Sequence, residues 1–211
     1  MQSWEGLALH YGYRPQALAR MRAKIERDFH YFARPDAIGY PDGHVWDLGG
    51  VQVRAVHMPG HTKGHSVLLV EPEGVAFIGD IDLTGFGPYY GDACSSLTDF
   101  RRTLETIAEI PARAWVTFHH KGVITARAKF LELLNAFREK IDRREQAILG
   151  ALATQPRSLD ALVSHRFLYP PDYSEIYIDD AERKTIAEHL DELIASGRVA
   201  LRDGVYSRVP G

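Results

Sequence analysis

The sequence contains little cysteine and no long apolar run, and each absence excludes a class of protein. Cys94 is the single cysteine, which excludes an internal disulfide and a metal site built from several thiolates. The longest apolar runs, Val67–Val70 and Val75–Ile78, are far shorter than the roughly 18 residues needed to span a bilayer. Residues Met1–Glu5 do not resemble the basic start of a secretory signal. These features predict a cytoplasmic protein without a membrane anchor.

Three common catalytic motifs are also missing. The sequence has no glycine-rich phosphate loop, no Gly-x-Ser-x-Gly motif and no Cys-x-x-Cys pair, which argues against nucleotide hydrolysis, serine-dependent hydrolysis and disulfide chemistry. The 211 residues are 45% apolar and carry 25 Lys and Arg against 28 Asp and Glu, as expected for an ordinary globular chain. Ten histidines remain, so imidazole and carboxylate groups are the available metal ligands.

Hydrophobic periodicity predicts a mixed α/β fold. A first helix is expected over residues 13–32, where a proline near the start precedes apolar residues at helical spacing. A later helix starts at about Thr98 and is capped by Ser95 or Ser96. The other expected elements are strands over 51–57, 66–70, 75–78 and 115–118, and a long helix over 125–149.

Toward the C-terminus the pattern changes to short helices and one hairpin. The expected elements are helices over 143–153, 158–167 and 181–196 and a hairpin of 199–201 with 205–207. They predict a winged-helix-like module over residues 142–211, after a first domain of residues 1–141. Residues 125–211 hold 13 Lys and Arg against 14 Asp and Glu, a net charge of −1, whereas a nucleic-acid surface is basic. A structural or assembly role is therefore favoured over nucleic-acid binding, and His165 and His189 are expected to face solvent.

Three segments place potential metal ligands directly after predicted strands. His61 lies in a glycine-flanked loop between two strands, Asp80 follows an apolar strand and a glycine, and His119-His120 follows a third strand. A strand end holds a side chain rigidly at the edge of a cleft, as a metal ligand requires. Each residue alone has an ordinary explanation, since a lone histidine is usually hydrogen-bonded and Asp80 could cap a turn. The order of all three favours one site at a sheet edge.

These segments resemble motifs of the metallo-β-lactamase-fold hydrolases. Pro59-Gly60-His61-Thr62-Lys63-Gly64-His65 resembles the third metal motif of the family, Phe77-Ile78-Gly79-Asp80 the fourth, and the strand before His119-His120 the fifth. The resemblance covers roughly residues 40–211. It implies an αββα-type half-fold in which His61 is a metal ligand, His65 supports it, and Asp80 bridges two metal ions as the catalytic carboxylate. Either His119 or His120 completes the second site.

The resemblance also implies a cofactor and a reaction. Zinc is the expected metal, with manganese or iron as alternatives, and a metal-activated water would attack a small-molecule substrate. The family's His-x-His-x-Asp-His signature is missing, because His10, His30, His44 and His57 stand isolated. We therefore expect a truncated or metal-site-depleted hydrolase that binds metal poorly and hydrolyses slowly. The alternative is a non-catalytic binding or oligomerisation protein, and an uncovered sheet face would favour a homo-oligomer.

The segment after Asp80 is a candidate wall of the substrate pocket. It is rich in glycine, proline and aromatic residues, which suits a loop beside a site. Tyr89 and Tyr90 are the residues that could contact substrate. The alternative is that these aromatic side chains only pack the loop onto the sheet.

Overall fold

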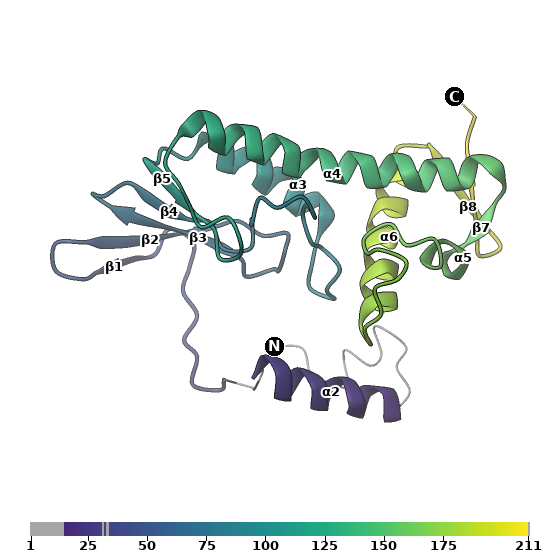
Figure 1. Cartoon of the computed structure of the whole chain (residues 1–211), viewed down its shortest axis with the longest axis horizontal. Coiled ribbons are helices and arrows are strands. Elements are labelled where there is room, and N and C mark those ends of the chain that lie inside the picture. Colours follow the sequence, from purple (N-terminus) through teal and green to yellow (C-terminus); the bar gives the residue numbers. More distant parts are fainter. Residues whose placement is uncertain (1–14, 31, 33, 211) are drawn as a thin grey trace.

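The computed structural model describes residues 15–30, 32 and 34–210 (Figure 1). Helix α2 (Pro15–Phe29) confirms the first predicted helix, and residues 13, 14 and 31 of that prediction lie outside the described part. Lys24 on α2 forms an ion pair with Glu175 at 3.3 Å, which ties the helix to the segment before α6. No helix in the described part of the chain is long and apolar enough to cross a membrane.

Six strands form one sheet in the order β1-β2-β3-β4-β5-β6. Strands β4 and β5 pair in parallel, and all other neighbours in this sheet are antiparallel. The bounds are β1 (Val45–Asp47), β2 (Gln52–His57), β3 (Ser66–Glu71), β4 (Val75–Phe77), β5 (Ala114–Val116) and β6 (Val123–Ile124). The four predicted strands are confirmed, whereas β1 and β6 were not predicted because they are too short to show alternation.

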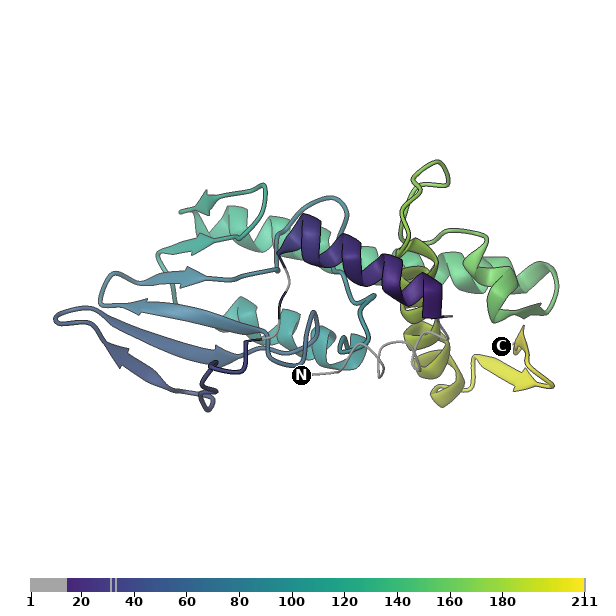
Figure 2. The same ribbon diagram turned by 90° about the horizontal axis from the view of Figure 1, so that it is seen from below.

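Helices α3 (Leu97–Thr106) and α4 (Arg127–Thr154) cover one face of the sheet (Figures 1 and 2). The side chain of Ser96, the second of the two candidate serines, caps α3 by accepting a hydrogen bond from a backbone N–H of its first turn. Trp115 of β5 stacks on Phe130 of α4 with ring centroids 4.4 Å apart. Both rings are fully buried, so this pair fastens α4 to the middle of the sheet.

Helix α4 differs from the prediction, which divided it into helices over 125–149 and 143–153. The structure has one helix of 28 residues. Its buried positions continue at helical spacing past the expected division, at Phe130, Leu134, Phe137, Ile141, Arg144, Ile148 and Leu152. The boundary placed between residues 141 and 142 therefore falls inside a continuous helix. The division into two domains stays a prediction.

The C-terminal part forms a second cluster of buried side chains. Its elements are β7 (Arg157–Ser158), α5 (Leu159–Val163), α6 (Ile178–Ala195), β8 (Val199–Arg202) and β9 (Val205–Arg208), with strand order β7-β9-β8. The hairpin and the helix predicted over 181–196 are present, whereas the helix predicted over 158–167 is limited to α5. The winged-helix assignment stays a prediction. The expectation that His189 faces solvent was wrong, because it is completely buried on α6, while His165 is exposed as expected.

Candidate active site

The three predicted strand ends meet at one edge of the six-stranded sheet. Asp80 follows β4 and His119 follows β5, and these neighbouring strands run parallel, so their ends lie at the same edge. The amide of Phe118 donates to the carbonyl of Gly79 at 3.1 Å, and this hydrogen bond joins the segments that follow β4 and β5. His61 reaches this edge from the loop between β2 and β3.

His61 presents its Nε2 to Asp80. Its Nδ1 lies 3.0 Å from the backbone carbonyl of Tyr89, and because a carbonyl only accepts, Nδ1 carries the proton. In the neutral ring Nε2 then carries a lone pair, and it lies 3.6 Å from Oδ2 of Asp80. Two acceptors that face each other are stabilised by a positive charge between them, either a proton on Nε2 or a metal ion.

His119, rather than His120, meets the other oxygen of Asp80. His119 Nε2 lies 3.2 Å from Asp80 Oδ1, and the Thr117 hydroxyl holds the turn by donating to the His119 carbonyl at 2.8 Å. His120 has a left-handed backbone with φ of 54° and an exposed side chain. Of the two candidates, His119 therefore has the geometry of a ligand, while both ligand assignments stay predictions.

His65 forms a hydrogen bond with the backbone of Asp80. Its Nδ1 donates to the Met58 carbonyl at 2.8 Å, and its Nε2 accepts the Asp80 amide at 3.2 Å, so both nitrogens are used. Burial lowers the pKa of His65, which keeps the ring neutral in this role. Gly79 makes the contact feasible, because a Cβ there would lie 2.7 Å from His65 Nε2. His65 thus contacts the backbone of Asp80, and its supporting role at a metal site stays a prediction.

The donor atoms suit a metal ion in type but not in number. Zinc binds imidazole nitrogens and carboxylate oxygens, and both kinds of atom meet at Asp80. Among the residues that the structure describes, however, no group of three or more His, Cys, Asp and Glu side chains could hold a metal ion. Each oxygen of Asp80 is instead paired with one histidine. The described residues therefore do not complete a metal site by themselves.

The two tyrosines proposed to contact substrate have different environments. Tyr90 is completely buried, and its hydroxyl lies 2.8 Å from Nε2 of His189. Tyr90 therefore does not line a surface open to substrate, and its side chain packs the loop against the rest of the protein. Tyr89 is half-buried, its ring centroid lies 5.8 Å from that of His61, and it remains the candidate for substrate contact.

Sequence patterns missed two residues beside this edge. Asp92 accepts a hydrogen bond from the Tyr89 hydroxyl at 3.2 Å, and burial raises its pKa. Arg144 of α4 donates to the carbonyl of Phe86 at 2.7 Å. Neither residue lies in a recognisable motif, and Arg144 is 58 positions from its partner, so no local signal could have identified it.

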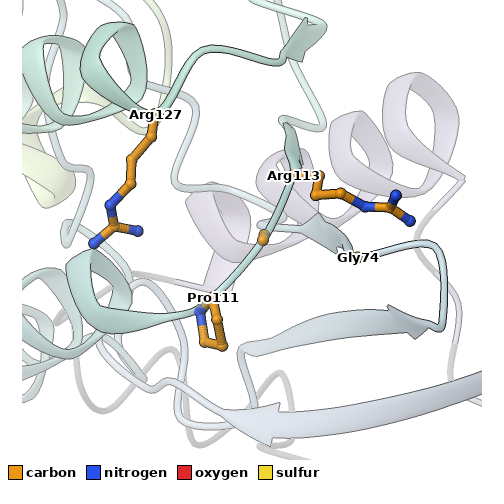
Figure 3. A pocket seen from close by; sticks show the side chains of 5 residues that line it. Gly74, Pro111, Arg113 and Arg127 are labelled. Carbon is orange, nitrogen blue, oxygen red and sulfur yellow. The ribbon is translucent and has the colours of Figure 1, made fainter.

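A pocket elsewhere on the molecule lies away from these residues. Figure 3 shows its lining side chains, among them Arg113 and Arg127, which point in different directions. Arg113 donates to the carbonyl of Glu73 at 2.9 Å, and Arg127 donates to that of Ala108 at 2.8 Å. Because Gly74 of this pocket precedes β4 and Asp80 follows it, the pocket lies at the opposite end of that strand.

Comparison with known proteins gives relatives in one superfamily. No protein-family model matches the chain. It is 27% identical over 165 residues to the atrochrysone carboxyl ACP thioesterase of Pseudocercospora fijiensis, covering 76% of this chain and 47% of that protein. It is 29% identical over 139 residues to the hydroxyacylglutathione hydrolase of Methylococcus capsulatus, covering 63% of this chain and 53% of that protein. The chain thus spans about half the length of the curated relatives it matches.

Solved structures show the same fold. A metallo-β-lactamase family protein from Thermus thermophilus has a TM-score of 0.65 and 26% identity, over 97% of this chain and 68% of that one. A β-lactamase domain protein from Burkholderia ambifaria has a TM-score of 0.66 and 20% identity, over 93% of this chain and 58% of that one. Together with the strand-end residues, these similarities confirm the resemblance found in the sequence. The chain belongs to the metallo-β-lactamase fold superfamily.

Proposed function

We propose that this chain is a hydrolase of the superfamily that acts on thioesters and depends on a metal ion, zinc in the first instance. The observation that carries the proposal is the position of Asp80, whose two carboxylate oxygens each face an imidazole Nε2, from His61 and from His119. The similarity to a protein named as a thioesterase supports the choice of substrate class. The single cysteine supports a cytoplasmic location.

The chain's own residues orient the reactive edge. Bound zinc would supply Lewis acidity and a water with a pKa near neutrality. The Tyr89 carbonyl fixes the ring of His61, so that Nε2 is the nitrogen directed at Asp80. His65 fixes the backbone of Asp80 through its amide. Because the described donors do not complete a metal site, we expect the chain to hold zinc weakly and to hydrolyse slowly.

An aromatic surface beside His61 suits the acyl part of a thioester. Tyr89 contacts His61, and a side-chain hydrogen bond joins it to Tyr169. The Tyr169 ring lies 5.5 Å from the rings of both Phe86 and Tyr173. Phe86 and Tyr173 are 39% and 44% exposed, so the surface is open to a ligand. Flat apolar rings bind a hydrophobic acyl group by burying its surface.

The test is hydrolysis of acyl thioesters by the purified chain, with and without added zinc. Asp80→Asn should bring the rate down to the uncatalysed background, because it removes the carboxylate that both histidines face. Asp82→Asn is the matched control, since the Asp82 carboxylate accepts from the Thr84 amide and hydroxyl at 3.1 and 3.0 Å. It should keep the rate within about twofold of wild type, because a change outside the site costs little. Equal rates for wild type and Asp80→Asn would disprove the proposal.

A second candidate function is assembly through the uncovered face of the sheet. Cross-strand pairs place Trp46 beside Val53, Leu68 beside Phe77, and Val116 beside Val123. This face lies opposite α3 and α4, and the side chains of these pairs are half-buried or, for Val123, 63% exposed, whereas Ala55 beside Leu68 is completely buried. Apolar sheet faces pack against each other at about 10 Å in sandwiches, so a second copy of the chain is the proposed occupant.

Light scattering after size exclusion tests the assembly function. We expect a dimer for wild type and a monomer for Phe77→Glu, because a charge in the centre of the face opposes its burial. Glu105→Lys, an exposed change on α3, should leave the dimer intact. A monomeric wild type at micromolar concentration would exclude this candidate.

A further inference from the structure

Arg144 is a buried cation that contacts the loop following Asp80. It lies on α4 with 6% of its surface exposed. Its guanidinium donates to the carbonyls of Phe86 and Pro88, and it lies 5.5 Å from the ring of Phe86 and 5.4 Å from that of Tyr90. Two carbonyls and two aromatic faces thus compensate a charge that is costly to bury. One side chain therefore touches three residues of a single loop.

Two helices hold this loop closely from both sides. At Gly87, which has φ of 85°, an added Cβ would lie 2.4 Å from Cβ of Lys140 on α4. At Gly91 an added Cβ would lie 3.0 Å from Cβ of Ala181 on α6. The hydroxyl of Tyr90, between them, is hydrogen-bonded to His189 of α6. The backbone from Phe86 to Gly91 is thus fixed between α4 and α6.

The fixed loop carries the carbonyl that sets the ring of His61. Tyr89 lies between Pro88 and Tyr90, both of which contact Arg144. The Tyr89 carbonyl accepts from Nδ1 of His61 at 3.0 Å. A shift of the loop would release this hydrogen bond, and the proton of the neutral ring could then occupy either nitrogen.

We propose that Arg144 is a positioning residue for His61: by holding the Phe86–Tyr90 segment, it keeps the Tyr89 carbonyl on Nδ1 and directs Nε2 toward Asp80. The contribution of this arrangement to hydrolysis rests on the proposed function. The tautomer of His61 does not depend on the proposed function, because hydrogen bonds within the chain determine it. Helices α4 and α6 thereby determine the orientation of the His61 ring through the Phe86–Gly91 loop.

The test is the tautomer of His61, measured by long-range ¹H–¹⁵N correlation on protein labelled at histidine. At about pH 8 an ordinary histidine is neutral, and the two ring nitrogens then have separate shifts. A His61→Gln sample assigns the signal. Wild type should show His61 with its proton on Nδ1. Arg144→Met should show a mixture of both tautomers, and Arg144→Lys should lie between them, because an ammonium lacks the planar fork that reaches two carbonyls.

Two internal controls separate positioning from general stability. Arg143→Met removes the neighbouring cation, which is exposed and paired with Glu139 at 3.1 Å, and should leave the His61 signal unchanged. The His65 signal should stay constant in every folded variant, because its partners, the Met58 carbonyl and the Asp80 amide, lie outside the loop. If Arg144→Met does not fold, Arg144→Lys carries the measurement.

The outcomes distinguish this inference from the proposed function. His61 with its proton only on Nδ1 in folded Arg144→Lys and Arg144→Met would overturn the positioning role. A tautomer mixture in these variants, together with no thioester hydrolysis by wild type, would support the positioning role and reject the proposed function. Where wild type does hydrolyse thioesters, Arg144→Lys should lower kcat and raise KM, because Phe86 and Tyr89 of the proposed acyl-binding surface lie in the same segment.

Discussion

The hydroxyl of Tyr90 and Nε2 of His189 lie 2.8 Å apart, although 99 positions separate the two residues in the chain. Both side chains are completely buried. This hydrogen bond joins the loop after Asp80 to helix α6, and it places a titratable ring where water does not reach it. Burial lowers the pKa of His189 to about 3, and the positive charges of Arg101 and Arg144 contribute to the lowering.

The first prediction is a loss of stability in mild acid that depends on His189. In the unfolded chain a histidine takes up its proton near pH 6.5, whereas native His189 stays neutral down to about pH 3. Between these values the unfolded state binds more protons, so the free energy of unfolding falls as pH falls, by at most about 1.4 kcal/mol per pH unit from this group. Urea unfolding between about pH 7 and pH 4.5 measures the slope.

The control for that prediction compares two histidines. His189→Leu should unfold with a shallower pH dependence than wild type in this range, even if its stability at pH 7 is lower. His165→Leu should keep the wild-type slope, because His165 is exposed. Identical slopes for wild type and His189→Leu would show that another group accounts for the acid sensitivity.

The second prediction concerns Gly79, whose backbone has φ of 54°. Gly79→Ala forces an alanine into a left-handed conformation and places its Cβ 2.7 Å from Nε2 of His65. We expect a loss of about 1–3 kcal/mol in the free energy of unfolding, the usual cost of such strain, and a displaced His65 ring. Gly85→Ala is the control, because an added Cβ at Gly85 meets no atom within 4 Å. Equal stabilities of the two variants would contradict the close contact.

The edge of the sheet that carries the site could be predicted from the sequence, because the information is local. Asp80 and His119 each follow a short apolar strand, and His61 lies in a glycine-containing loop between two more. Strand ends that carry polar residues gather wherever neighbouring strands run parallel. This reasoning accounts for Asp80 and His119, which follow the parallel strands β4 and β5, whereas His61 reaches the same edge from the loop between the antiparallel strands β2 and β3.

The choice between His119 and His120 could not be made in this way. It depends on the backbone of the turn, where His120 adopts a left-handed conformation and the Lys121 amide donates to the His119 carbonyl at 2.7 Å. The contacts of Arg144 and His189 could not be predicted from the sequence either. Both reach the loop after Asp80 from helices far along the chain, and such contacts leave no periodic signal.

The third prediction tests how α4 is fastened to the sheet. Phe130 is fully buried and stacks on Trp115 with an interplanar angle of 6°. Phe130→Ala should lower the free energy of unfolding by about 3–5 kcal/mol, because the cavity adds to the lost transfer energy. Val123→Ala, at a position 63% exposed, should cost about 0.5 kcal/mol or less. Chemical unfolding measures the free energy of unfolding of both variants. Equal losses for the two would show that the stack of Trp115 on Phe130 contributes little to this core.

The last prediction separates the two adjacent histidines. His119→Ala removes the ring whose Nε2 lies 3.2 Å from Asp80 Oδ1, while His120→Ala removes an exposed ring of the same type one residue later. Thioester hydrolysis by His119→Ala should fall by about a hundredfold or to background, and that by His120→Ala should stay within about threefold of wild type. Zinc titration against a coloured chelator should rank the variants in the same order, since of the two only His119 faces an oxygen of Asp80. The reverse order would assign the second histidine as the group that acts with Asp80.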